Sequence, residues 1–253
     1  MLTAYSQKEL VDRARDAGVM AYVVKPFTIG DLMPAIEIAI SRHTQMKSLA
    51  AEVADLGTHD STEAMARALL KRYSGQVAVA GFSLGGYVAQ EMTRQAPERI
   101  LGVALISTQA GTDPPAMAEV RAGWVRQARR EGMAAMAPIF LDKYASSHYL
   151  ASEMHKQSLD SMIARHSVEA FCSEQEAIRT RTDCSQALRG LRCPTLAVIP
   201  LQDALVPPSN QHKMVQSCGV HTVHEIAESG HTVMLESPNA VNAAMKSWLD
   251  QLF

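Results

Sequence analysis

The sequence is poor in cysteine and has no surplus of either charge. Four cysteines, none in a Cys-x-x-Cys pair, do not suggest a disulfide framework in a chain of 253 residues. We therefore expect free thiols in a reducing cytoplasm. Lys and Arg number 24 against 26 Asp and Glu. This balance gives no support to a nucleic-acid partner or to an anionic membrane surface.

The sequence also lacks a long apolar run and an apolar N-terminal segment. No stretch reaches the ~18 apolar residues that a membrane span needs. The N-terminal sequence MLTAYSQKELVDRARDAG is charged early and has no hydrophobic segment of a signal peptide. We therefore expect neither export nor membrane residence. The remaining composition, 47% hydrophobic and 20% charged, is that of a globular protein.

Apolar runs alternate with amphipathic segments over most of the chain, which predicts a mainly parallel α/β sheet covered on both faces. Strands are predicted at residues 77–80, 100–106, 196–199 and 220–226. Helices are predicted at residues 61–73, with Ser61 as N-cap, from 84 to about 95, and at 238–252. Residues 112–190 contain no strand candidate, and this helical stretch is typical of a cap inserted between two strands.

The most specific motif is Gly81-Phe82-Ser83-Leu84-Gly85, which lies between a predicted strand and a predicted helix. A nucleophilic serine at such a turn sits on strained backbone, and glycine two positions to either side avoids clashes with the strand and the helix. Free N–H groups at the start of the helix face a developing oxyanion. We predict Ser83 as the nucleophile and the N–H of Leu84 as an oxyanion donor. The alternative is a structural glycine-rich turn.

A serine nucleophile needs a base, and the base needs an acid that orients it. In sites of this kind the chain order is serine, acid, histidine. Asp203 follows the predicted strand 196–199, and His231 follows the strand 220–226 behind Gly230, which permits a tight turn. Asp203 could instead cap a turn, and His231 is one of nine histidines. Their position and order favour the catalytic interpretation. Three glutamates flank His231 too closely in sequence to be its orienting acid: Glu225, Glu228 and Glu236.

From about residue 57 onward the chain resembles the α/β-hydrolase superfamily. The resemblance lies in GFSLGGYVAQEM at 81–92, QAPERILGVALISTQA at 95–110, LQDALVPP at 201–208 and ESGHTVMLESP at 228–238. It implies a three-layer α/β/α fold, truncated at its front, with residues 57–111 and 191–253 as the core and 112–190 as the helical cap.

The resemblance also implies an esterase that cleaves small carboxylic esters without a cofactor. We expect no metal ion, because His221 and His224 on the predicted strand 220–226 would point to opposite faces. Ser83 would form an acyl-enzyme, His231 would move the proton, and Asp203 would hold His231. The same triad could serve an enol-lactonase, a C–C hydrolase or a perhydrolase. A further alternative is a non-catalytic module that mediates association.

Residues 1–47 instead resemble the C-terminal part of a response-regulator receiver domain. Thr3 and the Lys25-Pro26 pair match its switch threonine and its lysine. The stretch that would carry the phosphoacceptor aspartate is absent, so we expect no phosphorelay function. The chain therefore looks chimaeric, with residues 1–56 in the place of a hydrolase's first strands and one of its oxyanion loops.

The receiver-like segment could complete the sheet. We expect a strand at 21–24 to pair beside 77–80, with the N–H of Phe27 or of Thr28 as the second oxyanion donor, because Pro26 has no N–H. The alternative is that residues 1–56 only cover the sheet edge. A shortened sheet also leaves an unpaired edge, which predicts a homodimer through the N-terminal segment.

Overall fold

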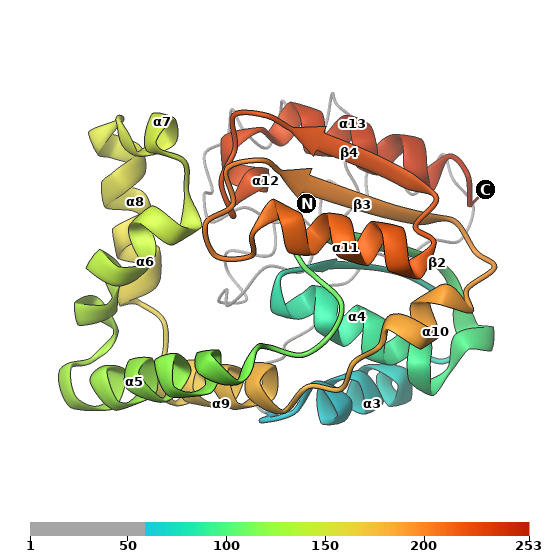
Figure 1. The fold of residues 1–253 in the computed structure, drawn as a ribbon, viewed down its shortest axis with the longest axis horizontal. Helices are drawn as coiled ribbons and strands as arrows, with labels where there is room; N and C mark the ends of the chain where they lie inside the picture. The colour runs from blue at the N-terminus through green and yellow to red at the C-terminus, as the bar shows by residue number, and fades with distance from the viewer. Residues whose placement is uncertain (1–58, 253) are drawn as a thin grey trace.

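The computed structural model describes residues 59–252, and a four-stranded parallel sheet lies at its centre (Figure 1). The strands follow one another in space in chain order: β1 Val77–Phe82, β2 Ile100–Ile106, β3 Thr195–Pro200 and β4 Thr222–Ile226. The four strands expected between residues 77 and 226 are confirmed, with small differences at their ends.

The strand register brings the carboxyl ends of the strands to one edge of the sheet. Phe82 is paired with Ile106, Ile106 lies opposite Val198, and Pro200 is paired with Ile226. Side chains that directly follow β1, β3 and β4 are therefore neighbours in space, although they are far apart in the sequence.

Helices cover both faces of the sheet, which confirms the three-layer fold with a mainly parallel sheet. One face carries α3 Thr62–Arg72, α4 Leu84–Gln95, α10 Ser185–Arg189 and α11 Pro208–Cys218. The other face carries α12 Val233–Glu236 and α13 Pro238–Leu249. The short helix η1 Pro97–Arg99 leads from α4 into β2.

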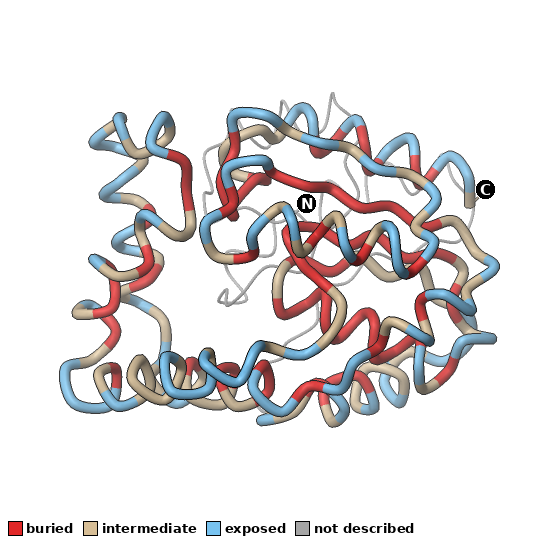
Figure 2. Tube along the Cα trace, viewed as in Figure 1, coloured by how far each residue is buried: buried red, intermediate tan, exposed pale blue. Residues whose placement is uncertain are grey.

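Alternation along the strands explains the two layers of helices. In β2, Val103 and Leu105 belong to the cluster under α4, whereas Ala104 and Ile106 belong to the cluster under α13. Successive side chains of a strand point to opposite faces, so an uninterrupted apolar run fills both cores. Figure 2 shows β2 and β3 almost wholly buried.

Local signals set the helix ends that the sequence predicts. The hydroxyl of Ser61 accepts a 3.2 Å hydrogen bond from the N–H of Ala64, which confirms it as the N-cap of α3. The last helix ends at Leu249, earlier than the expected residue 252.

Residues 112–190, all of them described, form helices and no strand. These are α5 Pro115–Glu131, η2 Met133–Met136, α6 Ala137–Tyr144, α7 Ser147–Leu150, α8 Glu153–Ala164, α9 Val168–Thr180 and α10. We call α5 through α9 the helical insertion. It has its own core around Met136, Phe140, Leu159 and Phe171, and it stands beyond the carboxyl ends of the strands (Figure 1).

Several expectations fall on residues outside the described range. They are the strand at 21–24, its pairing beside 77–80, the donors Phe27 and Thr28, and the dimer contact of the N-terminal segment. Within residues 59–252, β1 is an outermost strand that pairs with β2 alone. No helix in this range combines the length and the apolar character that a bilayer crossing requires.

Candidate active site

Ser83 occupies a strained turn between β1 and α4. Its φ is 50° and its ψ is −115°, and Ser107 is the only other non-glycine residue of the described range with a positive φ. The turn is tight because a Cβ on Gly81 would lie 2.2 Å from the carbonyl oxygen of Gly85. The expected strand–Ser83–helix geometry is therefore present, and glycine at 81 is required by close backbone approach.

The last residue of β2 and Thr108 just after it hold this turn in place. The N–H of Ser83 donates to the carbonyl of Ile106 at 3.0 Å, and the hydroxyl of Thr108 donates to the carbonyl of Ser83, also at 3.0 Å. A Cβ on Gly86 would lie 2.5 Å from the Thr108 side chain. The N–H of Leu84, at the first position of α4, has no acceptor among the described residues. This donor is therefore available to a ligand beside Ser83.

Asp203 and His231 form a buried hydrogen-bonded pair. Nδ1 of His231 lies 2.9 Å from Oδ2 of Asp203, and the two residues are 2% and 3% exposed. The same carboxylate accepts from the N–H groups of Leu205 and Val206, at 2.9 and 2.8 Å, and from Nε2 of Gln211 at 3.0 Å. These donors fix the carboxylate, which in turn orients the imidazole and leaves Nε2 of His231 without a described partner.

Two aromatic rings flank the imidazole of His231. The Phe82 ring centroid lies 4.9 Å from it, and the Tyr144 ring stacks on it at 6.0 Å. Phe82 directly precedes Ser83, and Tyr144 is the last residue of α6. Burial raises the pKa of Tyr144, so its hydroxyl stays protonated at neutral pH. The His231 ring is thus confined between the sheet and the helical insertion.

The loop that carries His231 is tied to the insertion through Glu236. Oε1 of Glu236 accepts from the N–H of Gly230 at 3.0 Å, and Oε2 accepts from the N–H of Ser146 at 3.1 Å. The N–H and the hydroxyl of Thr232 both donate to the carbonyl of Tyr144, at 2.7 and 2.8 Å. A Cβ on Gly230 would lie 2.6 Å from the Ser146 nitrogen, so close approach requires this glycine, which has no positive φ.

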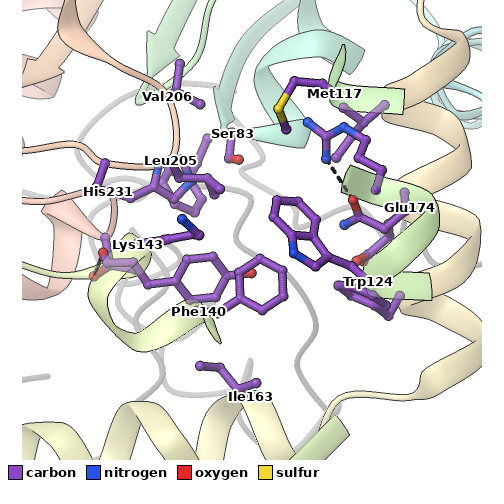
Figure 3. Close-up of a pocket in the computed structure, with 18 of the residues that line it drawn as sticks. Ser83, Met117, Trp124, Phe140, Lys143, Ile163, Glu174, Leu205, Val206 and His231 are labelled. Carbon is purple, nitrogen blue, oxygen red and sulfur yellow. Dashed lines mark hydrogen bonds between the residues drawn. The ribbon is translucent and has the colours of Figure 1, made fainter. Parts of the chain in front are cut away.

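A cavity of about 440 Å³ lies between the carboxyl edge of the sheet and the helical insertion (Figure 3). Ser83 and His231 line it on the side of the sheet. Its other walls are mainly apolar side chains of the insertion, among them Trp124, Met133, Phe140, Met162, Ile163 and Phe171. An apolar cavity with a few polar groups at one end is typical of a small-molecule site.

Most charged groups at the cavity wall are paired. Asp113 binds Nε of Arg121 at 2.6 Å and a terminal nitrogen of Arg181 at 2.7 Å. Burial alone would raise the pKa of Asp113, but the hydrogen bond from Arg181 and the charges of both arginines hold it below its usual range. Glu174 accepts from Nε2 of His166 at 3.0 Å, and both side chains are nearly buried.

The cysteines and the possible metal ligands of the described residues are the alternatives to Ser83 as reactive groups. All four cysteines lie in the described part and are free thiols. Burial and a hydrogen bond with Glu91 raise the pKa of Cys184 to about 12, so it is protonated at neutral pH. Within residues 59–252, no group of three or more His, Cys, Asp or Glu side chains could hold a metal ion.

The sequence comparison finds two different similarities. Residues 42–244 match the model of the "Alpha/beta hydrolase family", which begins earlier than the expected residue 57. The N-terminal 30% of the chain is 53% identical over 75 residues to the transcriptional regulatory protein PdtaR of Mycobacterium tuberculosis. The chain thus combines parts related to two proteins, as expected for a chimaera, and the two similarities overlap.

The chain spans about a third of the length of these first curated relatives. It covers 35% of PdtaR. It covers 36% of the bifunctional biotin biosynthesis protein BioHC of Teredinibacter turnerae, to which it is 24% identical over 206 residues, 76% of this chain.

Solved structures share the fold over most of the chain. A thermophilic esterase from Thermogutta terrifontis superposes with a TM-score of 0.70 at 26% identity, over 80% of this chain and 76% of the esterase. The enol-lactonase from Burkholderia xenovorans LB400 superposes with a TM-score of 0.65 at 21% identity, over 75% of this chain and 73% of that chain.

Proposed function

The chain belongs to the alpha/beta hydrolase family, and from this premise we propose that it is a serine hydrolase of small carboxylic esters. Ser83, His231 and Asp203 are its catalytic triad. The observation that carries the proposal is the buried 2.9 Å hydrogen bond between His231 and Asp203, beside a cavity that Ser83 also lines. The three residues follow β1, β3 and β4, whose carboxyl ends meet at this edge of the sheet.

The triad divides the reaction into two transfers. The hydroxyl oxygen of Ser83 attacks the ester carbonyl carbon, while Nε2 of His231 takes the hydroxyl proton. The C–O bond to the alcohol then breaks, and His231 returns the proton to the departing alcohol. Water, deprotonated by the same imidazole, hydrolyses the acyl-enzyme and restores Ser83. Asp203 stabilises the imidazolium that forms in each step.

The N–H of Leu84 is positioned to stabilise the oxyanion. It lies at the N-terminus of α4, where the unpaired N–H groups and the helix dipole favour negative charge. One donor of this kind is worth about 10²–10³ in rate. The second donor in this proposal is the N–H of Phe27 or of Thr28.

The cavity sets the size and polarity of the ester. A volume of about 440 Å³ accommodates a small acyl or alcohol group, and the aromatic and methionine side chains of the insertion favour an apolar one. In this proposal the helical insertion is the cap of the active site. Its hydrogen bonds to the loop of His231 make the cap part of the catalytic geometry.

Labelling with a fluorophosphonate probe tests the proposal. The probe should label the wild-type protein, and Ser83→Ala should abolish the adduct together with hydrolysis of p-nitrophenyl acetate and butyrate. Ser209→Ala, at an exposed serine on α11, is the matched control and should behave like wild type. Labelling that survives Ser83→Ala would overturn the proposed nucleophile. A protein that is neither labelled nor active would support the non-catalytic association module.

An enol-lactonase is the second candidate, because a solved enol-lactonase superposes over 75% of the chain. A lactone is a cyclic ester, so the same attack by Ser83 opens it while the enol remains attached to the acyl group. Comparing kcat/KM for an enol-lactone and for p-nitrophenyl esters separates the two substrates. Product analysis would also reveal C–C hydrolysis or perhydrolysis by the same triad.

A further inference from the structure

Lys143 differs from the other charged side chains of the cavity wall. Within residues 59–252 it has no ion-pair partner and no side-chain hydrogen bond. The others are paired: Asp113 with Arg121, Glu174 with His166, and His231 with Asp203. The ammonium group of Lys143 is therefore available to a ligand in the cavity.

The contacts of Tyr144, which follows Lys143, place the backbone of Lys143 near His231. The carbonyl of Tyr144 accepts two hydrogen bonds from Thr232, and the Tyr144 ring stacks on His231. Tyr144 directly follows Lys143 in the sequence, and Thr232 directly follows His231. These contacts therefore hold the backbone of Lys143 near His231. Figure 3 shows the Lys143 side chain ending between Leu205 and Phe140, on the side of the cavity where His231 lies.

The surroundings of Lys143 favour an anion in the cavity. An ammonium group donates three hydrogen bonds and accepts none, so its natural partner is an oxygen that carries negative charge. No described residue accepts a hydrogen bond from Lys143, and its half-buried position reduces screening by water. A lysine that only complemented the dipole at the end of α6 would act on stability and not on substrate choice.

We propose that Lys143 binds a carboxylate carried by the substrate, so that the preferred substrates are esters with one free carboxylate. This inference rests on the proposed function, because it concerns the same cavity. Ser83 would react with the ester at one end of the molecule while Lys143 holds the carboxylate at the other. The apolar side chains between them would contact the connecting carbon chain.

Paired substrates test this inference. Monomethyl adipate and methyl hexanoate differ in that a carboxylate replaces a terminal methyl group, and methanol release measures both reactions. We expect a higher kcat/KM for monomethyl adipate. Lys143→Met should lower that value by about tenfold or more, chiefly through KM, because a hydrogen bond between two charged groups is lost. The ratio of kcat/KM for monomethyl adipate to that for methyl hexanoate should fall toward one in this variant.

Two further variants separate charge from structure. Lys143→Arg retains the positive charge and should retain the preference for the acid ester. Lys156→Met, at an exposed lysine of α8 outside the cavity, is the matched control and should leave both substrates unchanged. An acetate ester of 6-hydroxyhexanoate places the carboxylate on the alcohol side, and a Lys143-dependent preference for either acid ester supports the inference.

Binding to the Ser83→Ala protein gives a readout that does not need turnover. Calorimetry should show monomethyl adipate binding more tightly than methyl hexanoate, and the added Lys143→Met change should remove the difference. Equal affinities and equal kcat/KM values would overturn the inference, while Ser83-dependent hydrolysis would leave the proposed function standing. Conversely, Lys143-dependent binding in a protein that hydrolyses no ester would overturn the proposed function and retain the anion site.

Discussion

Glu236→Gln tests whether the helical insertion positions the catalytic histidine. The two carboxylate oxygens of Glu236 accept from different segments: Oε1 from the N–H of Gly230 and Oε2 from the N–H of Ser146. Gly230 directly precedes His231, and Ser146 follows α6. Glutamine has the same shape but only one oxygen, so in either orientation its NH₂ group faces one of the two N–H donors.

The structure gives the size of the expected effect. Gly230 and Ser146 are both buried, so the N–H that loses its acceptor cannot turn to water. A buried donor without a partner costs about 1–3 kcal/mol, and we therefore expect the free energy of unfolding to fall by about 2 kcal/mol. The clash also moves the loop that carries His231. A misplacement of about 1 Å at a catalytic group can cost about 100-fold in rate, and we expect kcat to fall about 10- to 100-fold.

The assay combines urea unfolding, followed by tryptophan fluorescence, with steady-state hydrolysis of p-nitrophenyl butyrate. The loss should fall on kcat and leave KM nearly unchanged, because Glu236 does not line the cavity. Glu228→Gln is the matched control, since Glu228 lies in the same loop but is exposed and has no described partner. It should change neither the unfolding free energy nor kcat.

Two results would refute this reasoning in different ways. Unchanged stability and unchanged kcat would show that the two hydrogen bonds contribute nothing measurable. Lower stability with an unchanged kcat for the folded enzyme would show that Glu236 stabilises the insertion without positioning His231.

Three further changes address the turn, the triad and the response to acid. Gly81→Ala places a Cβ 2.2 Å from the carbonyl oxygen of Gly85, and we expect a loss of about 3 kcal/mol or more, measured by thermal unfolding. Asp203→Asn leaves His231 without its carboxylate, and kcat should fall about 10⁴-fold with a parallel fall in the rate of fluorophosphonate labelling. Burial would raise the pKa of Glu91, but hydrogen bonds from neighbouring side chains lower it below 4.5, so its contribution to stability is present above pH 4.5 and is lost as pH falls through the lowered value. In urea unfolding as a function of pH, Glu91→Gln should therefore flatten the loss of stability below pH 4.5.

Features encoded by local pattern could be predicted from the sequence. The central strands β2 and β3 are buried on both faces, so each is an almost unbroken apolar run between polar turns. The turn at Ser83 is equally local, because Gly81 and Gly85 lie two residues to either side of it. Asp203 and His231 could be placed because both lie in loops that follow predicted strands, and parallel strands bring such loops to one edge of the sheet.

The residues that hold Ser83, His231 and Asp203 in place act through contacts between distant segments. No local sequence pattern predicts such contacts. The Thr108 hydroxyl donates to the carbonyl of Ser83, 25 residues away in the sequence. The Thr232 hydroxyl donates to the carbonyl of Tyr144, 88 residues away. Its closeness to His231 in sequence argues against Glu236 as the orienting acid, and the Glu236 carboxylate instead accepts hydrogen bonds from the backbone of Gly230 and Ser146. Gln211 lies in α11, the helix that follows Asp203, and its amide donates to the Asp203 carboxylate, a contact that the sequence does not predict.

The outer edge of β1 bears on both the completeness of the sheet and the proposed oxyanion hole. Val79 packs into the core under α4 and Ala80 into the core under α13, so β1 is covered on both faces. A parallel strand covered in this way normally lies inside a sheet, whereas β1 pairs with β2 alone among the described residues. A strand at 21–24 on that edge would place the N–H of Phe27 or Thr28 at the carboxyl end of the sheet, on the opposite side of Ser83 from β2. The same pairing would thus complete the sheet and supply the second oxyanion donor, and it would make the receiver-like segment part of the proposed catalytic machinery.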